Sequence, residues 1–253
     1  MTDQVERERQ FHNQRFSQQA HDRAALTGYY SINTHLEQAF NQRVMACCAE
    51  ADLLEIGCGT GEVALFWESL GARVTAIDIS DEGIARAQQT AEQRGGNVCF
   101  LRMDAADLGE LPQASFDVIT GISILHHLEL ERAFRSLARV LRPSGRAFFI
   151  EPLGHNPVIN IFRRLTPALR SADEHPLRLP ELDAARRYFS EVHTVHFHLL
   201  TLFAVPFRRL PWFPGLLRFL HRGDQALFRA IPWVQRWSWI VILELGSPRD
   251  LAG

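Results

Sequence analysis

Residues 53–61 read Leu-Leu-Glu-Ile-Gly-Cys-Gly-Thr-Gly, an apolar run that ends in three glycines with one residue between each. The run is typical of a buried strand, and a helical pattern over residues 62–70 follows it directly. Glycine adopts positive φ values and has no Cβ, so backbone at these positions can approach a ligand closely. Open α/β sheets bind ligands where a strand ends and the next helix begins. The segment therefore predicts a ligand-binding turn.

Short apolar runs alternate with amphipathic stretches on both sides of this turn. Strands separated by helices indicate βαβ units and a parallel sheet. Strands are expected at 52–56, 73–79, 98–102, 116–122 and 145–151, and helices near 61–70, 81–94 and 129–141. Further along, 154–190 is predicted to be helical with proline interruptions, and 191–200 and 237–245 are the last strand candidates.

The glycine spacing separates two kinds of nucleotide-binding turn. A dinucleotide-binding loop has the pattern G-x-G-x-x-G, and its third glycine would fall at residue 62, which is Glu62. An acidic residue at the start of a helix repels a pyrophosphate, which binds at a helix N-terminus. The G-x-G-x-G turn, with Glu55 ahead of it and Glu62 behind it, therefore favours a ligand without phosphate.

Two aspartates follow the next two predicted strands. Asp78 ends the second strand, where a carboxylate can accept both hydroxyls of a ribose. We expect Ile79 to pack on one face of adenine. Asp104 follows the third strand and can accept from the exocyclic amine of adenine, with the Ala105 amide reaching a ring nitrogen. Asp alone in a loop is usually a turn former, so the position of both residues after this turn carries the prediction.

Five segments now resemble the successive motifs of the class I S-adenosylmethionine-dependent methyltransferases, in particular the subgroup acting on small molecules and lipids. They are EIGCGTG at 55–61, AIDIS at 76–80, MDAADL at 103–108, FDVITGISILHHL at 116–128 and LRPSGRAFFIEP at 141–152. The resemblance spans about residues 50 to 155. It implies a Rossmann-like α/β fold with a seven-stranded, mostly parallel sheet, an antiparallel last strand and helices on both faces.

The resemblance also implies which residues bind S-adenosylmethionine. In this family pattern the glycine turn binds the amino acid portion, Asp78 binds the ribose, and Asp104 and Ala105 bind the adenine. Gly121 begins the segment that runs beneath the sulfonium. The turn contributes Glu55, Gly57, Cys58, Gly59 and Gly61.

Histidines are the candidate proton acceptors for an oxygen or nitrogen nucleophile, because their ordinary pKa lies near neutrality. His126 and His127 follow the fourth predicted strand, and His155 follows the fifth. Each has an alternative interpretation as a residue that packs without moving a proton. No metal site is expected: His196 and His198 are only two residues on one strand face, and no cysteine pair has zinc-site spacing.

Composition narrows the partners. The chain has 253 residues, 46% of them hydrophobic, and a formal net charge of −2. The whole molecule therefore lacks the basic field that nucleic-acid binders usually show, while a local basic patch stays open. All its basic residues apart from histidine are arginines, which excludes lysine Schiff-base chemistry. The polar start is unlike a secretory signal and no segment resembles a membrane span. The expected location is the cytoplasm.

Residues 1–50 are expected to form an N-terminal helical cap, and residues 51–253 a single domain with a hydrophobic helical insertion near 201–236. Both additions are predicted to close over the carboxyl edge of the sheet. The insertion is rich in Phe, Trp and Arg, and its only acid is Asp224. Three interpretations stay open: ordinary packing, a roof over an apolar acceptor pocket, or peripheral contact with a membrane.

The sequence thus predicts an S-adenosylmethionine-dependent methyltransferase that acts at oxygen or nitrogen of a small, apolar or lipid-like acceptor. Residues 120–125, TGISIL, lack the Asn/Asp-Pro-Pro-aromatic signature that resembles amino methyltransferases of DNA, RNA or protein glutamine. The alternatives are a non-catalytic cofactor-binding subunit with the same fold and a membrane-associated lipid methyltransferase. Neither the acceptor nor the oligomeric state follows from the sequence.

Overall fold

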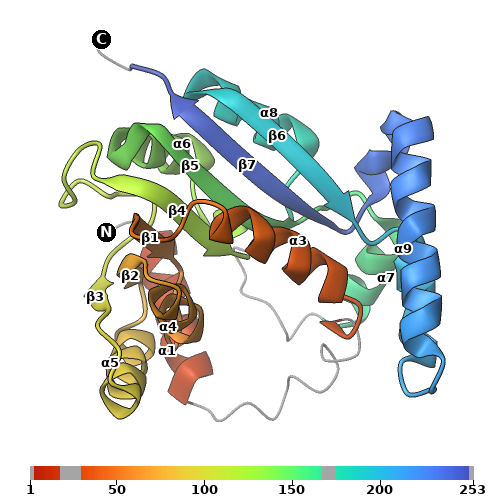
Figure 1. The fold of residues 1–253 in the computed structure, drawn as a ribbon, viewed down its shortest axis with the longest axis horizontal. Coiled ribbons are helices and arrows are strands. Elements are labelled where there is room, and N and C mark those ends of the chain that lie inside the picture. The colour runs from red at the N-terminus through yellow and green to blue at the C-terminus, as the bar shows by residue number, and fades with distance from the viewer. Residues whose placement is uncertain (1–2, 18–29, 167–174, 251–253) are drawn as a thin grey trace.

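The computed structural model describes residues 3–17, 30–166 and 175–250. These residues form a seven-stranded sheet with the strand order β3-β2-β1-β4-β5-β7-β6 (Figure 1). The first five strands are parallel, and β7 is antiparallel to both β5 and β6. The strands are β1 (Asp52–Ile56), β2 (Arg73–Asp78), β3 (Cys99–Arg102), β4 (Phe116–Ile122), β5 (Leu141–Pro152), β6 (Phe189–Phe197) and β7 (Ile240–Pro248). The predicted fold class is confirmed.

Helices cover both faces of the sheet because neighbouring strand residues point to opposite sides. On one face, Leu53 of β1 joins a core that includes residues of α3, α4 and α5; on the other, Leu54 joins a core that includes residues of α6 and α8. These helices are α3 (Thr34–Met45), α4 (Glu62–Ser69), α5 (Asp81–Arg94), α6 (Leu130–Val140) and α8 (Leu179–Ala184).

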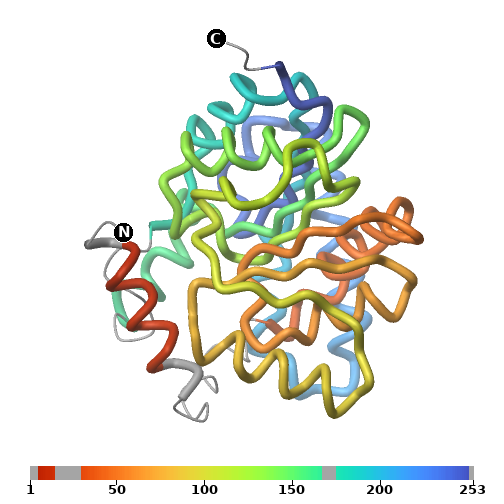
Figure 2. Tube along the Cα trace, turned by 90° about the vertical axis from the view of Figure 1, so that its left-hand side faces the viewer, coloured from red at the N-terminus to blue at the C-terminus, as the bar shows by residue number. Residues whose placement is uncertain are grey.

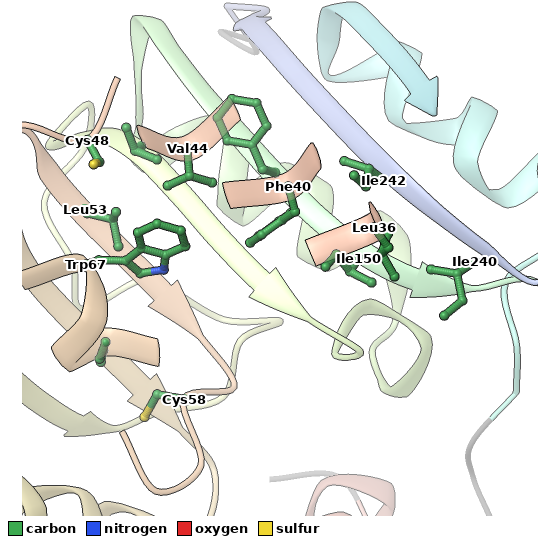
Figure 3. Close-up of a cluster of buried hydrophobic side chains, with 14 of the residues drawn as sticks. Leu36, Phe40, Val44, Cys48, Leu53, Cys58, Trp67, Ile150, Ile240 and Ile242 are labelled. Carbon is green, nitrogen blue, oxygen red and sulfur yellow. The ribbon is translucent and has the colours of Figure 1, made fainter. Parts of the chain in front are cut away.

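The helix α3 packs flat on one face of the sheet. Its buried side chains Leu36, Phe40 and Val44 recur at helical spacing and meet Ile150 of β5 and Ile242 of β7 (Figure 3). The expectation that this part of residues 1–50 closes over the carboxyl edge is therefore wrong: burial of an apolar stripe draws α3 onto the sheet instead.

The first helix, α1 (Asp3–Ser17), takes a different place, at the rim of the molecule (Figure 2). It is tied to α5, where Arg9 Nη1 lies 2.6 Å from Asp81 Oδ2. Asn13 Oδ1 also accepts from Ser80 Oγ at 2.6 Å and from the Glu82 amide at 3.3 Å. Ser80 itself caps α5 by accepting from the Gly83 amide. These bonds fix α1 beside the carboxyl ends of β1 and β2.

The insertion between β6 and β7 is helical. It consists of the 3-10 helix η4 (Leu200–Phe207), α9 (Phe213–Ala230) and the 3-10 helix η5 (Pro232–Trp237). Asp224 of α9 is fully buried and accepts from the backbone amides of Leu199, Leu200 and Thr201, so it joins α9 to the start of η4. Among the described residues, no helix is both long and apolar enough to cross a membrane.

Several predicted boundaries move by a few residues. The fifth strand begins at Leu141 rather than at residue 145, because Leu141 already pairs with Phe116 of β4 before an irregularity in register. The later strands cover residues 189–197 and 240–248 instead of 191–200 and 237–245. Within 154–190, the described helices are α7 (Pro157–Leu165), α8 and the 3-10 helix η3 (Ala185–Arg187), while residues 167–174 lie outside the described ranges.

Candidate functional site

The glycine turn has the backbone that its sequence predicts. Gly57, Gly59 and Gly61 all have positive φ, at 72°, 52° and 79°. A Cβ on Gly61 would lie 2.9 Å from the side chains of Ala87 and Phe100. Only glycine satisfies both the conformation and the packing at residue 61.

A cavity of about 670 Å³ opens beside this turn, a size typical of small-molecule sites. Its walls come from the carboxyl ends of β1, β2, β3 and β4, from the 3-10 helix η1 (Leu125–His127) and the start of α6, and from α1. The lining includes Val5, Glu8, His12, Gly57, Cys58, Gly59, Thr60, Glu62, Val63, Ile77, Asp78, Ile79, Met103, Asp104, Ala105, Ala106, Ile122, Ser123, Ile124, His127, Leu128, Glu129 and Arg132.

Asp78 is held by backbone amides at the centre of one wall. Its Oδ2 accepts from the Gly59 amide at 2.8 Å, and its Oδ1 accepts from the Ser80 amide at 2.9 Å. A carboxylate has about four lone-pair sites, so two remain for a ligand. The fixed carboxylate can therefore accept hydroxyl groups from the cavity side.

Glu55 lies buried at the end of β1, and its Oε2 has no hydrogen-bond partner. Loss of water around this carboxyl, and then the negative charge of Asp78, raise its pKa to about 8. A cation bound nearby would favour the charged form of Glu55 and offset the cost of burying it. The turn thus places the carboxyl groups of Glu55 and Asp78 next to glycine backbone that a ligand can approach closely.

The loop after β3 is ordered by Asp104, whose Oδ1 accepts from the Ala106 amide at 2.9 Å. This bond gives Asp104 the structural role of stabilising a turn, which is the usual role of an isolated aspartate in a loop. Asp104 and Ala105 nevertheless line the cavity, as does Ile79. The loop therefore presents both a carboxylate and backbone to a ligand.

His126 is not among the residues that line the cavity, and it pairs with Glu151 near the end of β5. The distance from His126 Nδ1 to Glu151 Oε2 is 2.7 Å, and both side chains are buried. The other oxygen of Glu151 accepts from the amides of Ile124 and Leu125 at 2.9 and 2.8 Å. Glu151 and His126 therefore hold η1 in place.

His127 faces the cavity and meets two residues of α1. Its Nδ1 lies 3.2 Å from Glu8 Oε2, and His12 Nε2 lies 3.5 Å from that same oxygen. The rings of His12 and His127 are 5.5 Å apart between centroids. Three polar side chains from two distant segments thus meet at the wall formed by α1 and η1.

Comparison with known proteins agrees with this geometry. Residues 54–149 match a family model described as a methyltransferase domain. The domain at residues 54–149 is therefore a methyltransferase domain of the class I S-adenosylmethionine-dependent type.

Two curated relatives share this region. The chain is 35% identical over 111 residues to the S-adenosyl-L-methionine-dependent Diels-Alderase iccD of Talaromyces variabilis, covering 42% of this chain and 38% of the relative. It is 41% identical over 98 residues to the 27-O-demethylrifamycin SV methyltransferase of Amycolatopsis mediterranei, covering 37% and 36%. The matches therefore span less than half the length of these relatives.

A solved structure extends the likeness to nearly the whole chain. Magnesium protoporphyrin IX methyltransferase from Synechocystis PCC 6803 superposes with a TM-score of 0.59 over 98% of this chain and 100% of that chain. The sequence identity is 15%, so this likeness concerns the fold alone.

The structure brings most of the predicted cofactor residues of this methyltransferase domain together. The cavity is lined by Gly57, Cys58, Gly59, Asp78, Ile79, Asp104 and Ala105. Glu55, Gly61 and Gly121 lie outside the lining, behind the turn or in β4. At Gly121 a Cβ would lie 2.8 Å from Ile124 and 2.9 Å from Phe149, so this glycine permits close packing beneath the cavity floor.

The three histidines that were predicted to be catalytic lie in different environments. Only His127 lines the cavity. His126 is engaged by Glu151, and His155 Nε2 accepts from the Leu179 amide at 3.4 Å. Burial, followed by the charges of Arg236 and Arg178, lowers the pKa of His155. These contacts support packing roles for His126 and His155.

Glu62 repels a phosphate less strongly than its sequence position predicts. Glu62 lines the cavity, but its carboxylate pairs with both Nη atoms of Arg94 at 2.7 and 2.8 Å. Its repulsion of a phosphate is reduced by that pairing. The glycine spacing and the carboxylates of Glu55 and Asp78 carry the distinction from a dinucleotide site.

Val5, Glu8 and His12 of α1 were missed by the sequence prediction. Glu8 and His12 are four residues apart and therefore share one face of a helix. This spacing was visible, but nothing in the sequence indicated that the face meets His127.

Proposed function

We propose that this chain is an S-adenosylmethionine-dependent methyltransferase that acts on oxygen or nitrogen of a small, apolar acceptor. The observation that carries the proposal is the cavity itself, which joins a glycine turn, an amide-held Asp78 and a histidine-bearing wall. The methyl donor and the acceptor would share this cavity, with the donor along the strand ends and the acceptor against α1 and η1.

The residues fit the donor. Asp78 has lone pairs available for the two ribose hydroxyls, and Asp104 with Ala105 offers an acceptor and an amide to adenine. The unpartnered Oε2 of Glu55 lies behind the turn, where the amino acid portion would lie. A cationic ammonium group near it would compensate a buried carboxylate that has no partner of its own.

When bound, the donor supplies a methyl group on a cationic sulfur, which leaves as the neutral thioether S-adenosylhomocysteine. The acceptor's lone pair forms the new bond as the carbon–sulfur bond breaks, and the acceptor's proton goes to a base or to solvent. The protein contributes alignment and exclusion of water. Ser123 and Ile124 lie between the donor turn and His127, so this stretch would position the acceptor.

The acceptor wall is mixed in character. Val5, Ile124 and Leu128 supply apolar surface, while His127, backed by Glu8, supplies the polar group that meets the acceptor atom. This pattern supports an apolar molecule with one reactive hydroxyl or amine. The Amycolatopsis relative is named for a methyl transfer to a natural product, which agrees with that class of acceptor.

A second candidate is a protein that binds the cofactor without transferring its methyl group, as a non-catalytic subunit would. The Talaromyces relative is named a Diels-Alderase that depends on S-adenosylmethionine, so the shared domain also occurs in a protein named for another reaction. Release of S-adenosylhomocysteine distinguishes the two candidates.

Calorimetry with S-adenosylmethionine tests donor binding. We expect one site per chain and no binding of a nicotinamide dinucleotide. Binding of the dinucleotide instead would reject the proposal. Incubation of a labelled donor with a panel of phenols, enols and amines then tests transfer: donor binding with no labelled product from any of them would favour the non-catalytic alternative.

We also propose that the insertion contacts a membrane surface. Large apolar side chains are exposed on it, among them Phe219 at 72% and Trp233 at 61%. Its acid, Asp224, is buried and engaged by backbone amides. Six arginines stand exposed around the aromatic residues: Arg208, Arg209, Arg218, Arg222, Arg229 and Arg236.

Arginine with tryptophan and phenylalanine is the mixture that favours an anionic membrane interface. No described residue of 201–236 lines the cavity, so the prediction that the insertion roofs the acceptor pocket is not supported. A cytoplasmic leaflet is the surface we propose, and the four free cysteines agree with a reducing compartment.

Flotation with vesicles of phosphatidylglycerol and phosphatidylcholine tests this surface. The double variant Arg218→Glu/Arg222→Glu should weaken binding by about tenfold or more, since each basic residue contributes about 1 kcal/mol at an anionic surface. The matched control is Arg135→Glu on the exposed side of α6. Equal binding by the wild type and the double variant would reject the proposal.

A further inference from the structure

We infer that Glu8, His12 and His127 form a binding site for a divalent transition-metal ion at the acceptor wall of the cavity. The three side chains each offer one ligand atom, and these atoms all lie within 4.8 Å of one another. Two imidazoles and one carboxylate are a recurrent ligand set for zinc and for non-haem iron.

The separations fit a shared ion. Two ligands at about 2.1 Å from a metal lie about 3.0 Å apart at a right angle and about 3.4 Å apart at a tetrahedral angle. Glu8 Oε2 lies 3.2 Å from His127 Nδ1 and 3.5 Å from His12 Nε2. Both distances match neighbouring ligands on one ion.

The two segments that carry the ligands are fixed independently of each other. On one side, Arg9 and Asn13 fasten α1 to the start of α5 through Asp81 and Ser80. On the other, Glu151 accepts from the amides of η1 and holds it against β5. Ligands on supported backbones keep their geometry.

The chemistry of the set selects the ion. Imidazole nitrogens suit zinc, cobalt and iron, whereas magnesium and calcium prefer oxygen ligands. All three residues also line the cavity. Three protein ligands leave at least one coordination position for a molecule from that cavity, which is the arrangement of a catalytic rather than a structural site.

The role of the ion rests on the proposed function. A hydroxyl of the acceptor that binds in the open position would have its pKa lowered, and its proton would pass to solvent. The acceptor oxygen would then be ready to attack the methyl carbon, with the carbon–sulfur bond electrons leaving on sulfur. The ion would replace a histidine base at this wall.

Titration of the metal-free protein with Co²⁺ tests the site without any need for activity. We expect one Co²⁺ per chain and visible absorption bands of low-symmetry, nitrogen-containing coordination, with Zn²⁺ displacing the signal. Glu8→Gln and His12→Ala should each weaken Co²⁺ binding by about tenfold or more. Glu8→Asp, which retains an anionic ligand, should recover part of the affinity that Glu8→Gln loses.

The matched control is the double variant His35→Ala/His221→Ala. These two rings stack 4.3 Å apart elsewhere in the molecule, and their removal should leave Co²⁺ binding unchanged. Glu8→Gln keeps the size of the buried Glu8 side chain, so this variant should still fold and bind S-adenosylmethionine, and its thermal midpoint and its affinity for the donor are measured beside each titration.

Two outcomes would overturn the inference: no Co²⁺ or Zn²⁺ binding by the wild type, or Co²⁺ binding by both Glu8→Gln and His12→Ala that is as tight as that of the wild type. Transfer that resists chelators while Glu8→Gln loses activity would assign Glu8 and His127 to an acid–base pair instead. Failure of S-adenosylmethionine to bind would reject the proposed function, and it would leave the Co²⁺ result unaffected.

Discussion

Each half of the sheet buries a titratable group in its neutral form. One group is an acid, whose charged form is negative, and the other is a base, whose charged form is positive. Glu55 ends β1, and burial together with the charge of Asp78 raises its pKa to about 8. His198 follows β6, and burial lowers its pKa to about 3, with His221 and His35 adding to the shift. At neutral pH the first is protonated and the second is unprotonated.

The surroundings of these groups show why only one half forms the site. His198 Nδ1 is paired with Thr201 Oγ1 at 3.1 Å, and its ring lies beside Phe197 and Trp239. Glu55 instead lies next to the glycine turn, where a bound cation would stabilise its charged form. A buried ionisable group whose charged form a ligand can stabilise indicates a functional site. A buried ionisable group that is surrounded only by other side chains of the protein indicates a structural role.

The largest effect we expect is acid destabilisation through His198. Its pKa is about 6.5 when unfolded and about 3 when folded, so the unfolded chain binds the extra proton. The stability that the neutral residue provides is present above pH 6.5 and is lost as the pH falls toward 3, by up to about 1.4 kcal/mol per pH unit.

Urea unfolding at several pH values, in wild type and His198→Asn, measures this loss. Asparagine tolerates the φ of +65° found at residue 198. The variant should lack the part of the acid slope that His198 causes. An identical slope in both proteins would place the acid sensitivity elsewhere.

Glu55 should give the opposite pH dependence. Its folded pKa lies above the ordinary 4.5, so its stabilising contribution is complete below pH 4.5 and is lost as the pH rises toward 8. Glu55→Gln should therefore stabilise the ligand-free protein at pH 8 by about 4 kcal/mol. Thermal unfolding at pH 5 and pH 8 provides the comparison, and an equal midpoint shift at both values would contradict it.

Asp78 and Asp224 sharpen the contrast, since both are buried carboxylates that accept from backbone amides. Asp78→Ala should weaken S-adenosylmethionine binding by about 100-fold, because two hydrogen bonds to a charged group are lost. Asp224→Asn should lower the thermal midpoint and leave that affinity unchanged. Calorimetry on both variants tests the distinction, which fails if the two lose affinity equally.

The smallest effect concerns Glu62. Its side chain is 57% exposed and Arg94 is 54% exposed, so their ion pair should contribute about 0.5 kcal/mol or less. Glu62→Gln should change both stability and donor affinity very little. A tenfold loss of affinity in calorimetry would show that Glu62 contacts the donor after all.

The donor half could be predicted from sequence because its signals are local. The G-x-G-x-G turn, Asp78 and Asp104 each follow a strand whose apolar run is easily recognised, and parallel strand ends converge. The seven-stranded, mostly parallel sheet and its antiparallel last strand followed from the resemblance and are confirmed by the structure.

The acceptor wall could not be predicted in the same way. Glu8 and His127 are far apart in sequence, and their contact depends on the bonds of Arg9 and Asn13 to α5. The sequence pattern also placed α3 over the sheet edge, although its apolar stripe packs on the face. Long-range contacts between amphipathic segments leave no periodic signal that identifies the partner.

The position of α1 has an evolutionary consequence. The donor-binding residues lie on strand ends within the segment that matches the methyltransferase family, whereas Glu8 and His12 lie on a helix outside it. If the proposed function is correct, substitutions on α1 alter the acceptor wall of the cavity without changing the strand ends that carry Asp78 and Asp104. Selection for a new acceptor would then act on the 15 residues of α1 and leave the residues proposed to bind the donor unchanged.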